Sequence, residues 1–320
     1  MSKKWITLFA AAAFFAACTA LAQTANVVRV VIAFPPGGPV DFVARILADG
    51  LTRELGQTVI VENRPGANGA ISAQAVAKSA PDGMTLWFSS VGAAAINPSL
   101  YESLPYDPQK DFAPVSGVVD NVEVLVVSTK NPANSAAELV AASRQKKEAT
   151  PIASSGIGSV PHLAMELLVE STKANMLHVP YKGAAPAITD VIGGQVAAFF
   201  GDVPGLIGHI RGGRLKPIGI AAPKRHPLLP DVRTLDEQGI HGVESSNWYA
   251  LFAPAKTPPA RIEALNATVR RALATDQVRS RLIASGAEPA PSSPEELAAL
   301  LKQDMAKWGT IIRDKKIKGE

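Results

Sequence analysis

The sequence has little that would support disulfide, redox or nucleic-acid chemistry. Cys18 is its single cysteine, and aromatic residues make up 6% of the 320 positions. One thiol forms no internal disulfide, and so few aromatic rings leave little to stack on nucleic-acid bases. Lys and Arg number 32 against 28 Asp and Glu, a formal charge of +4 that is too small to indicate a polyanionic partner. We therefore expect no nucleic-acid partner.

Known catalytic and metal-binding motifs are also missing. The sequence contains no Gly-x-Ser-x-Gly and no phosphate-binding Gly-x-x-x-x-Gly-Lys-[Ser/Thr], and Gly156-Ile157-Gly158 lacks the third glycine of a dinucleotide-binding loop. The five histidines lie at least fifteen residues apart, without the close spacing of typical metal ligands. We expect no cofactor, no metal site and no enzymatic activity.

Only the N-terminal segment is apolar over a long stretch. Lys3 and Lys4 precede an apolar run over 5–22 that ends in Ala20-Leu21-Ala22, the pattern of a cleaved secretory signal. We predict that residues 1–22 are a signal peptide and that the protein is periplasmic; a retained membrane anchor is the alternative. Cys18 raises a second alternative, a lipid anchor, although Phe15 stands where lipoprotein signals usually have Leu.

Beyond the signal, apolar runs of strand length alternate with amphipathic stretches of helix length, which predicts an α/β fold with parallel strands. The pattern predicts one strand–helix unit over the first hundred residues and a second unit over 150–221. Helices alone follow residue 259. The strands are expected at 27–34, 58–61, 84–90, 122–128, 150–154, 176–180, 195–200, 216–221 and 247–253.

Loops rich in Gly and Ser follow several of these strands and precede helices. Such loops gather at the carboxyl edge of a sheet, where ligands bind, and glycine lets the backbone approach a ligand closely. The first is 34–41, with Pro35-Pro36-Gly37-Gly38 before a helix, and the second is 154–162, with three serines and two glycines. Each is equally explained as a rigid turn or a helix cap. Weaker candidates are Ser89-Ser90, residues 179–183 and Gly201-Asp202.

Several segments together resemble a known family. They are Val31-Ile32-Ala33-Phe34-Pro35-Pro36-Gly37-Gly38-Pro39-Val40-Asp41, Val61-Glu62-Asn63-Arg64-Pro65-Gly66-Ala67, Asn97-Pro98-Ser99-Leu100-Tyr101, the stretch 154–163 and His178-Val179-Pro180-Tyr181-Lys182-Gly183. In this order they resemble the extracytoplasmic receptors of tripartite tricarboxylate transporters, the Bug family. The resemblance covers the chain beyond the signal.

The resemblance implies a two-lobed periplasmic binding protein of the type II-like, Venus flytrap kind. It would be a monomer that closes on a small organic carboxylate and delivers it to the membrane subunits of the transporter. Lobe I would comprise 23–123 and 251–320, and lobe II 124–250. The ligand-binding residues implied or proposed are Phe34, Gly37, Gly38, Asp41, Ser89, Ser90, Ser154, Ser155, Gly158, Ser159, His162, Tyr181, Gly183, Asp202 and Trp248.

Three of these residues need separate roles. A carboxylate in the ligand's path would repel an anion, so Asp41 is expected to orient the first loop. Asp202, which stands one position beyond the acid of many family members, either accepts a hydrogen bond from the ligand or caps the next helix, and we favour the cap. For Trp248, and for Tyr249 beside it, we favour packing in the strand that joins the lobes over stacking on an aromatic ligand.

Two other functions stay open. The same protein could present its ligand to a membrane sensor kinase instead of a transporter. It could also be a periplasmic hydrolase that uses Ser155 or Ser159 with His162, because Ser159 and His162 lie one helical turn apart, but no orienting acid accompanies them in a known template.

Overall fold

Two β-sheets that share one long strand form the framework of the computed structural model, which describes residues 27–319. In the first sheet β1 pairs in parallel with β2 and β3, and β9 runs antiparallel between β3 and β4. The short strand β10 pairs with β4 on its outer side. The bounds are β1 (Val27–Ile32), β2 (Thr58–Asn63), β3 (Thr85–Ser90), β4 (Phe112–Ser128), β9 (Ser246–Pro254) and β10 (Glu288–Pro289).

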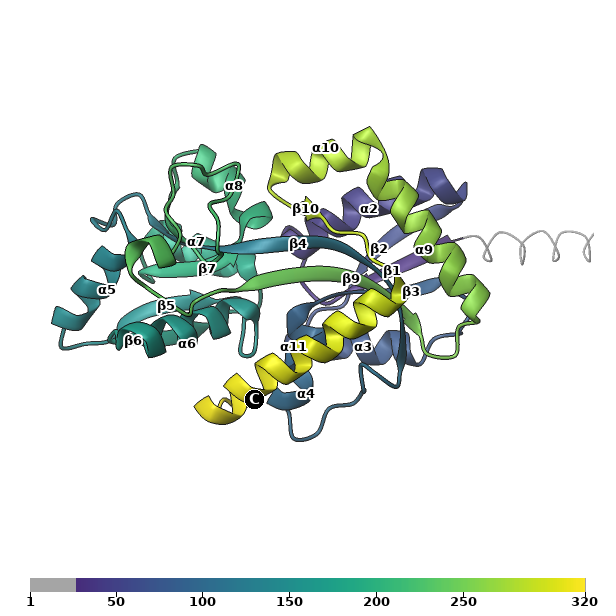
Figure 1. Ribbon diagram of the computed structural model, residues 1–320, viewed down its shortest axis with the longest axis horizontal. Helices are drawn as coiled ribbons and strands as arrows, with labels where there is room; N and C mark the ends of the chain where they lie inside the picture. Colours follow the sequence, from purple (N-terminus) through teal and green to yellow (C-terminus); the bar gives the residue numbers. More distant parts are fainter. Residues whose placement is uncertain (1–26, 320) are drawn as a thin grey trace, which may run out of the picture.

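The second sheet is built on the other half of β4. β7 and β8 pair with β4 in antiparallel fashion, and β5 lies in parallel between β7 and β6. These strands are β5 (Thr150–Ser154), β6 (Met176–Pro180), β7 (Ala198–Asp202) and β8 (Leu215–Ile220). Figure 1 shows the result, two lobes side by side that are connected by β4 and β9. The two-lobed α/β fold predicted above is confirmed.

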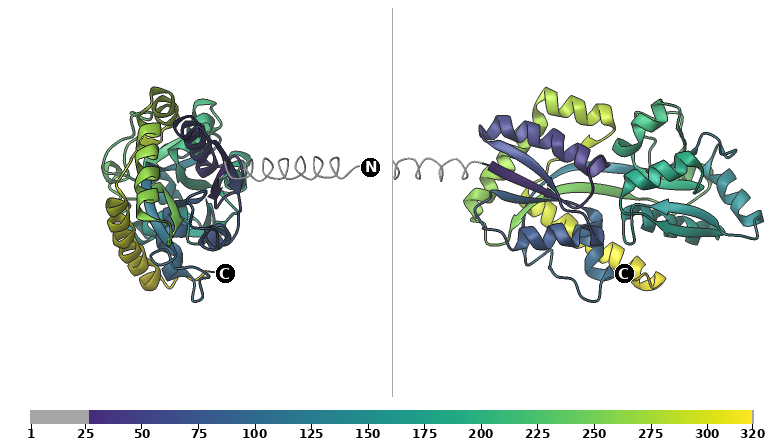
Figure 2. Two further views of the ribbon diagram at one scale, coloured as in Figure 1. Left: turned by 90° about the vertical axis from the view of Figure 1, so that its right-hand side faces the viewer. Right: turned by 180° about the vertical axis from the view of Figure 1, so that it is seen from behind.

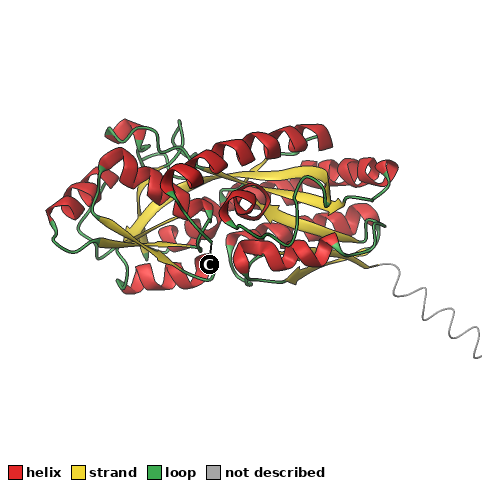
Figure 3. Cartoon of the chain, turned by 90° about the horizontal axis from the view of Figure 1, so that it is seen from below, coloured by secondary structure: helices red, strands yellow, loops and turns green. Residues whose placement is uncertain are grey.

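Helices cover both faces of the first sheet (Figure 3). α2, α9 and α10 bury their apolar faces against one side, together with Val30, Phe88 and Leu251. α3 and α11 cover the other side, where Trp87 and Trp308 are buried. The helices are α2 (Pro39–Leu55), α3 (Ala70–Ala77), α4 (Asn97–Leu100), α9 (Pro259–Ala274), α10 (Asp276–Ser285) and α11 (Pro294–Lys315), with short helical turns at Ala67–Gly69 and Gly92–Ile96.

The second sheet is covered in the same way. α5 (Ala136–Gln145) and α6 (Val160–Thr172) pack on one face, and α7 (Ala184–Gly193) and α8 (Val203–Arg211) pack on the other. Figure 2, right, shows this lobe from behind, with the C-terminal part of the chain returning to the first lobe. A short turn, Asp236–Gln238, completes the elements.

The strand that differs most from its predicted length is β4. The apolar pattern predicts a strand at 122–128, whereas β4 already begins at Phe112. Its first half contains Pro114 and Gly117, and its pairing with β9 shifts register between Pro114 and Ser116 and again between Gly117 and Val119. These irregularities hide the alternation that indicates a strand.

The described residues do not test the predicted signal segment or the predicted lobe boundaries. The predicted signal segment 1–22 and Cys18 lie outside the described residues. The lobe boundaries at 123/124 and 250/251 stay a prediction, because β4 and β9 belong to both lobes. Within 27–319, no helix is both long and apolar enough to cross a membrane.

Candidate functional site

A cavity with about 580 Å³ of empty space, part of which is open to solvent, lies where the two lobes meet. Four helices begin at its wall: α2 from the first lobe, and α6, α7 and α8 from the second. The lining residues are Phe34, Pro35, Gly38, Pro39, Val40, Asn68, Ser90, Gly92, Ser155, Ser159, Val160, Pro161, Gly183, Ala184, Ala185, Pro186, Phe199, Gly201, Asp202, Asn247 and Tyr249.

The helix starts give the cavity a positive electrostatic character without a cationic side chain. The first N–H groups of a helix have no partner within the helix, and the helix dipole adds a partial positive charge there. Gly38 and Gly183, which precede α2 and α7, have no side chain that could accept from these groups. Ser90, Ser155 and Ser159 add hydroxyl groups to the lining. An anion is therefore the ligand group that this part of the wall suits best.

Asp41 holds the first loop in shape from behind. Its carboxylate accepts hydrogen bonds from Gly37 N at 3.1 Å, Arg45 Nη2 at 2.8 Å and Asn63 Nδ2 at 2.9 Å. Burial raises the pKa of Asp41, but these hydrogen bonds outweigh it and lower the pKa below the usual value. Asp41 does not line the cavity, and its contacts agree with the orienting role.

Two histidines support the second loop. His162 and His178 stack with ring centroids 3.7 Å apart. Gly158 N donates to His162 Nδ1 at 3.1 Å, and Ser154 Oγ lies 2.6 Å from His178 Nε2. Burial, and then the neighbouring His162, lower the pKa of His178 to about 3, so this ring is neutral at physiological pH. Ser154 and both histidines lie behind the cavity wall.

Contacts across the cleft show that the lobes are closed. Asn68, in the first lobe, donates through Nδ2 to the carbonyl oxygen of Gly158 in the second lobe at 3.0 Å, and to Asn97 Oδ1 at 2.9 Å. Lys315 on α11 forms an ion pair with Glu170 on α6 at 2.9 Å. Gly158 has a φ of 73°, and a Cβ atom built at this position would overlap the side chain of Leu100.

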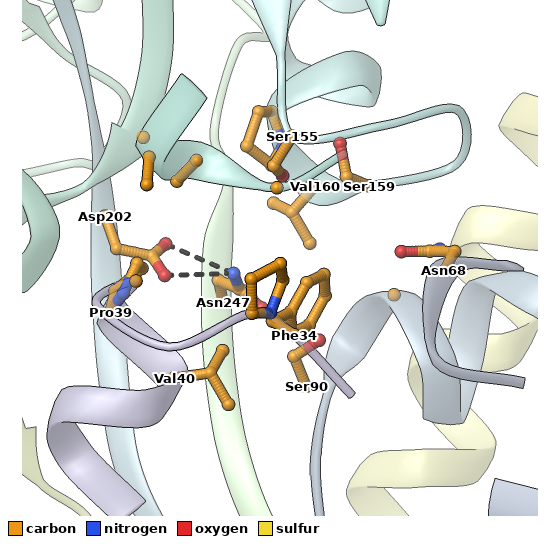
Figure 4. A pocket seen from close by; sticks show the side chains of 18 of the residues that line it. Phe34, Pro39, Val40, Asn68, Ser90, Ser155, Ser159, Val160, Asp202 and Asn247 are labelled. Atoms are coloured by element: carbon orange, nitrogen blue, oxygen red, sulfur yellow. Dashed lines mark hydrogen bonds between the residues drawn. The ribbon is translucent and has the colours of Figure 1, made fainter. Parts of the chain in front are cut away.

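The acidic end of the cavity is formed by Asp202 and its neighbours (Figure 4). Asn247 Nδ2 donates to both Asp202 oxygens, at 3.1 and 3.2 Å, and the Tyr249 hydroxyl donates to Oδ2. Glu123, fully buried on β4, lies directly opposite Asp202 in the strand pairing. Burial, and then the Asp202 charge, raise the pKa of Glu123 well above its usual value; burial raises the pKa of Asp202 to about 6.

The structure places the predicted residues in two groups. Those in the cavity wall are Phe34, Gly38, Ser90, Ser155, Ser159, Gly183 and Asp202. Those outside it are Gly37, Asp41, Ser89, Ser154, Gly158, His162, Tyr181 and Trp248. Tyr181 lines a neighbouring hollow and donates to Asp190 at 2.6 Å. Trp248 is buried and donates to Asp304 at 2.7 Å, which agrees with packing.

The favoured role of Asp202 as a helix cap is wrong. Asp202 is the residue before α8, but its side chain makes no capping hydrogen bond. It instead accepts from Asn247 and Tyr249 on β9. These two contacts turn the carboxylate from the helix start toward the strand that connects the lobes.

Sequence reasoning missed Asn68 and Asn247, and it gave Tyr249 the same packing role as Trp248. Asn68 lies in a short turn with a positive φ of 44°, which carries no strand-to-helix signal. Asn247 and Tyr249 alternate with Trp248 along β9, so they share the face opposite to Trp248. Counting this two-residue period would have placed Tyr249, and not Trp248, at the cavity.

A cavity between two α/β lobes defines the class of two-lobed solute-binding proteins. The family model described as tripartite tricarboxylate transporter family receptor matches residues 43–317. The chain is 37% identical to the protein BugT of Bordetella pertussis over 311 residues, covering 97% of this chain and 95% of BugT. The chain belongs to this receptor family, and the resemblance noted above is confirmed.

Solved structures are similar to this chain in sequence and fold. A protein from R. palustris with adipate is 32% identical, with a TM-score of 0.87 over 89% of this chain and 96% of its own. MatC from Rhodopseudomonas palustris with bound malate is 34% identical, with a TM-score of 0.84 over 89% and 98%. The family consists of receptors, so the chain is a binding protein and not an enzyme. Consistently, Ser159 Oγ contacts the backbone N–H of His162 and not its ring.

Proposed function

We propose that the protein captures a small organic carboxylate in the periplasm and delivers it to the membrane subunits of a tripartite tricarboxylate transporter. The observation that carries this proposal is the meeting of four helix N-termini at one cavity between the lobes. Membership in the receptor family, and the adipate and malate bound by two relatives, give further support.

The cavity wall explains how an anion is held without a counter-cation. Asp202 is the only charged side chain among the described residues that line the cavity, so the positive character comes from backbone N–H groups and hydroxyls. Charge-assisted hydrogen bonds to several fixed donors are strong, and a wall without Lys or Arg leaves no unpaired cation buried when the ligand departs.

The test is isothermal titration calorimetry of the chain from Gln23 onward with mono-, di-, tri- and amino-carboxylates, each beside its methyl ester of the same length. We expect at least one carboxylate to bind, and its ester to bind about 100-fold more weakly because the charge-assisted hydrogen bonds are lost. Equal binding of acid and ester, or no carboxylate binding to cooperatively folded protein, would disprove the carboxylate grip.

Substitutions test whether the ligand binds in this cavity. We expect Ser155→Ala to weaken binding about 10-fold, because it removes a hydroxyl from the wall. Ser280→Ala, on the exposed side of α10, is the matched control and should bind as the wild type does. Delivery is tested in vesicles that contain the transporter's membrane subunits, where uptake should require the ligand-loaded receptor.

A further inference from the structure

The Asp202 end of the cavity presents a carboxylate together with one amide oxygen, Asn247 Oδ1, that lacks a donor among the described residues. Asp202 is 5% exposed and Asn247 8% exposed. Because Asn247 Nδ2 is fixed by the Asp202 carboxylate, its Oδ1 is the free end of the amide, and it accepts no hydrogen bond from the described part of the chain. A buried acceptor without a donor is costly. The lining includes no Lys, Arg or His that could supply one.

The acidic end carries a negative charge at neutral pH. Glu123 and Asp202 face each other across a strand pair, and like charges at such positions repel. Glu123 is the more deeply buried acid, and its pKa is raised well above the usual value, so a proton shared by the pair resides on Glu123 and can be donated to Asp202. Asp202 receives the hydrogen bonds of Asn247 and Tyr249, and its pKa of about 6 leaves it ionised above that pH.

The serine hydroxyls suited to an anion lie away from this end (Figure 4), although α8 begins directly after Asp202. In Figure 4, Asp202 is on one side of the cavity and Asn68 is on the opposite side. In this view Ser155 and Ser159 lie above Phe34, and Ser90 lies below it. The lining also contains Val40, Val160 and Phe199, which are apolar. A matching ligand has a carboxylate and a cationic donor that are separated by an apolar portion.

A second carboxylate would fit this end poorly. It would be brought next to the ionised and buried Asp202, where repulsion between like charges is less screened than in bulk water. A protonated amine has the opposite requirements: it donates to Asp202 and to Asn247 Oδ1, and it neutralises the buried charge.

We propose that Asp202 and Asn247 Oδ1 form a subsite for an ammonium group, so that the ligand is an amino-carboxylate and not a simple dicarboxylate. This inference rests on the proposed function for the carboxylate half of the ligand. The ammonium half rests on Asp202 and Asn247 alone.

The experiment is calorimetry at about pH 7.5 with three matched series: unbranched amino-carboxylates, the monocarboxylates of the same length and the dicarboxylates of the same length, with α-amino acids and alkylamines as further arms. We expect the best amino-carboxylate to bind about 10- to 100-fold more tightly than its monocarboxylate and dicarboxylate counterparts. Asp202→Asn keeps the side-chain shape and should abolish this preference. Asp304→Asn, an acid removed next to Trp248 on the other face of β9, is the control and should preserve it.

The possible outcomes distinguish the ammonium subsite from the proposed carboxylate receptor. If monocarboxylates or dicarboxylates bind as tightly as the amino-carboxylates, or if Asp202→Asn keeps the preference, the ammonium subsite is wrong while the carboxylate receptor stands. Loss of the preference in Asp304→Asn as well would show that Asp202 is not its source. If alkylamines bind and no carboxylate does, the ammonium subsite stands and the proposed function fails. If nothing binds, both fail.

Discussion

Replacing Glu123 with Gln should change how the stability of the ligand-free protein depends on pH. Glu123 is fully buried opposite Asp202, and its pKa is raised well above the usual value, first by burial and then by the Asp202 charge. In the unfolded chain a Glu is ionised above about pH 5. The native state therefore binds one proton more than the unfolded state, so the free energy of unfolding falls as the pH rises. When folding raises the pKa of an acid, the resulting loss of stability is absent below the pKa of the unfolded chain and grows as the pH rises above it.

The size of the effect follows from that single proton. While Glu123 keeps its proton in the native state, one extra bound proton changes the free energy of unfolding by about 1.4 kcal/mol per pH unit, so the change between about pH 6.5 and pH 8 is at most roughly 2 kcal/mol. For a chain of this length that corresponds to roughly 4 °C in Tm. Asp202 and Asp120 also have raised pKa values, but both are about 6, so most of their titration lies below this range. Gln has the shape of the protonated acid and does not titrate.

The assay is thermal unfolding followed by circular dichroism, for wild type and Glu123→Gln, without ligand, at the two pH values. The Tm of the variant minus that of the wild type should be up to about 4 °C larger at the higher pH. Titrating groups that do not interact with Glu123 cancel in this difference. A difference that is the same at both pH values would refute the assignment of the retained proton to Glu123.

Two further substitutions test the closed cleft and the first loop. In Gly158→Ala, the new side chain would sit at a φ of 73° and overlap Leu100 across the cleft. We therefore expect calorimetry to show ligand affinity reduced at least about 10-fold. Unchanged affinity would mean that the ligand binds without this closure. Asp41→Asn loses the ion pair with Arg45, so denaturant titration should show the free energy of unfolding lowered by about 1 kcal/mol, while carboxylate affinity does not rise. A tenfold gain in that affinity would show that Asp41 repels the ligand.

The strand and helix pattern predicted the fold well because most elements carry a clear period. β5 and β6 have the bounds that their apolar patterns predict. The first half of β4 was missed because Pro114, Gly117 and two register shifts interrupt its alternation. The helical turn Gly92–Ile96 was missed because it is apolar on every side and entirely buried, so it shows no amphipathic period.

Residues of the candidate site were predictable only where they lie in a loop that follows a strand and precedes a helix. That rule located Gly38, Ser155 and Gly183, which the structure brings to one cavity. It gave no indication of Asn68, whose role depends on a contact with the other lobe. Nor did it indicate that Asp202 would turn toward Asn247, because that contact joins β7 to β9 across a large sequence separation.

The start of four helices at one cavity has a consequence for how the ligand preference can change. Every residue except proline has a backbone N–H group, so a point substitution at most positions of this wall leaves the anion-binding donors in place. The acidic end, directly before α8, is instead defined by the side chains at positions 202 and 247. A change of ligand class therefore requires as few as one or two substitutions there, and the receptor retains its hold on the carboxylate throughout.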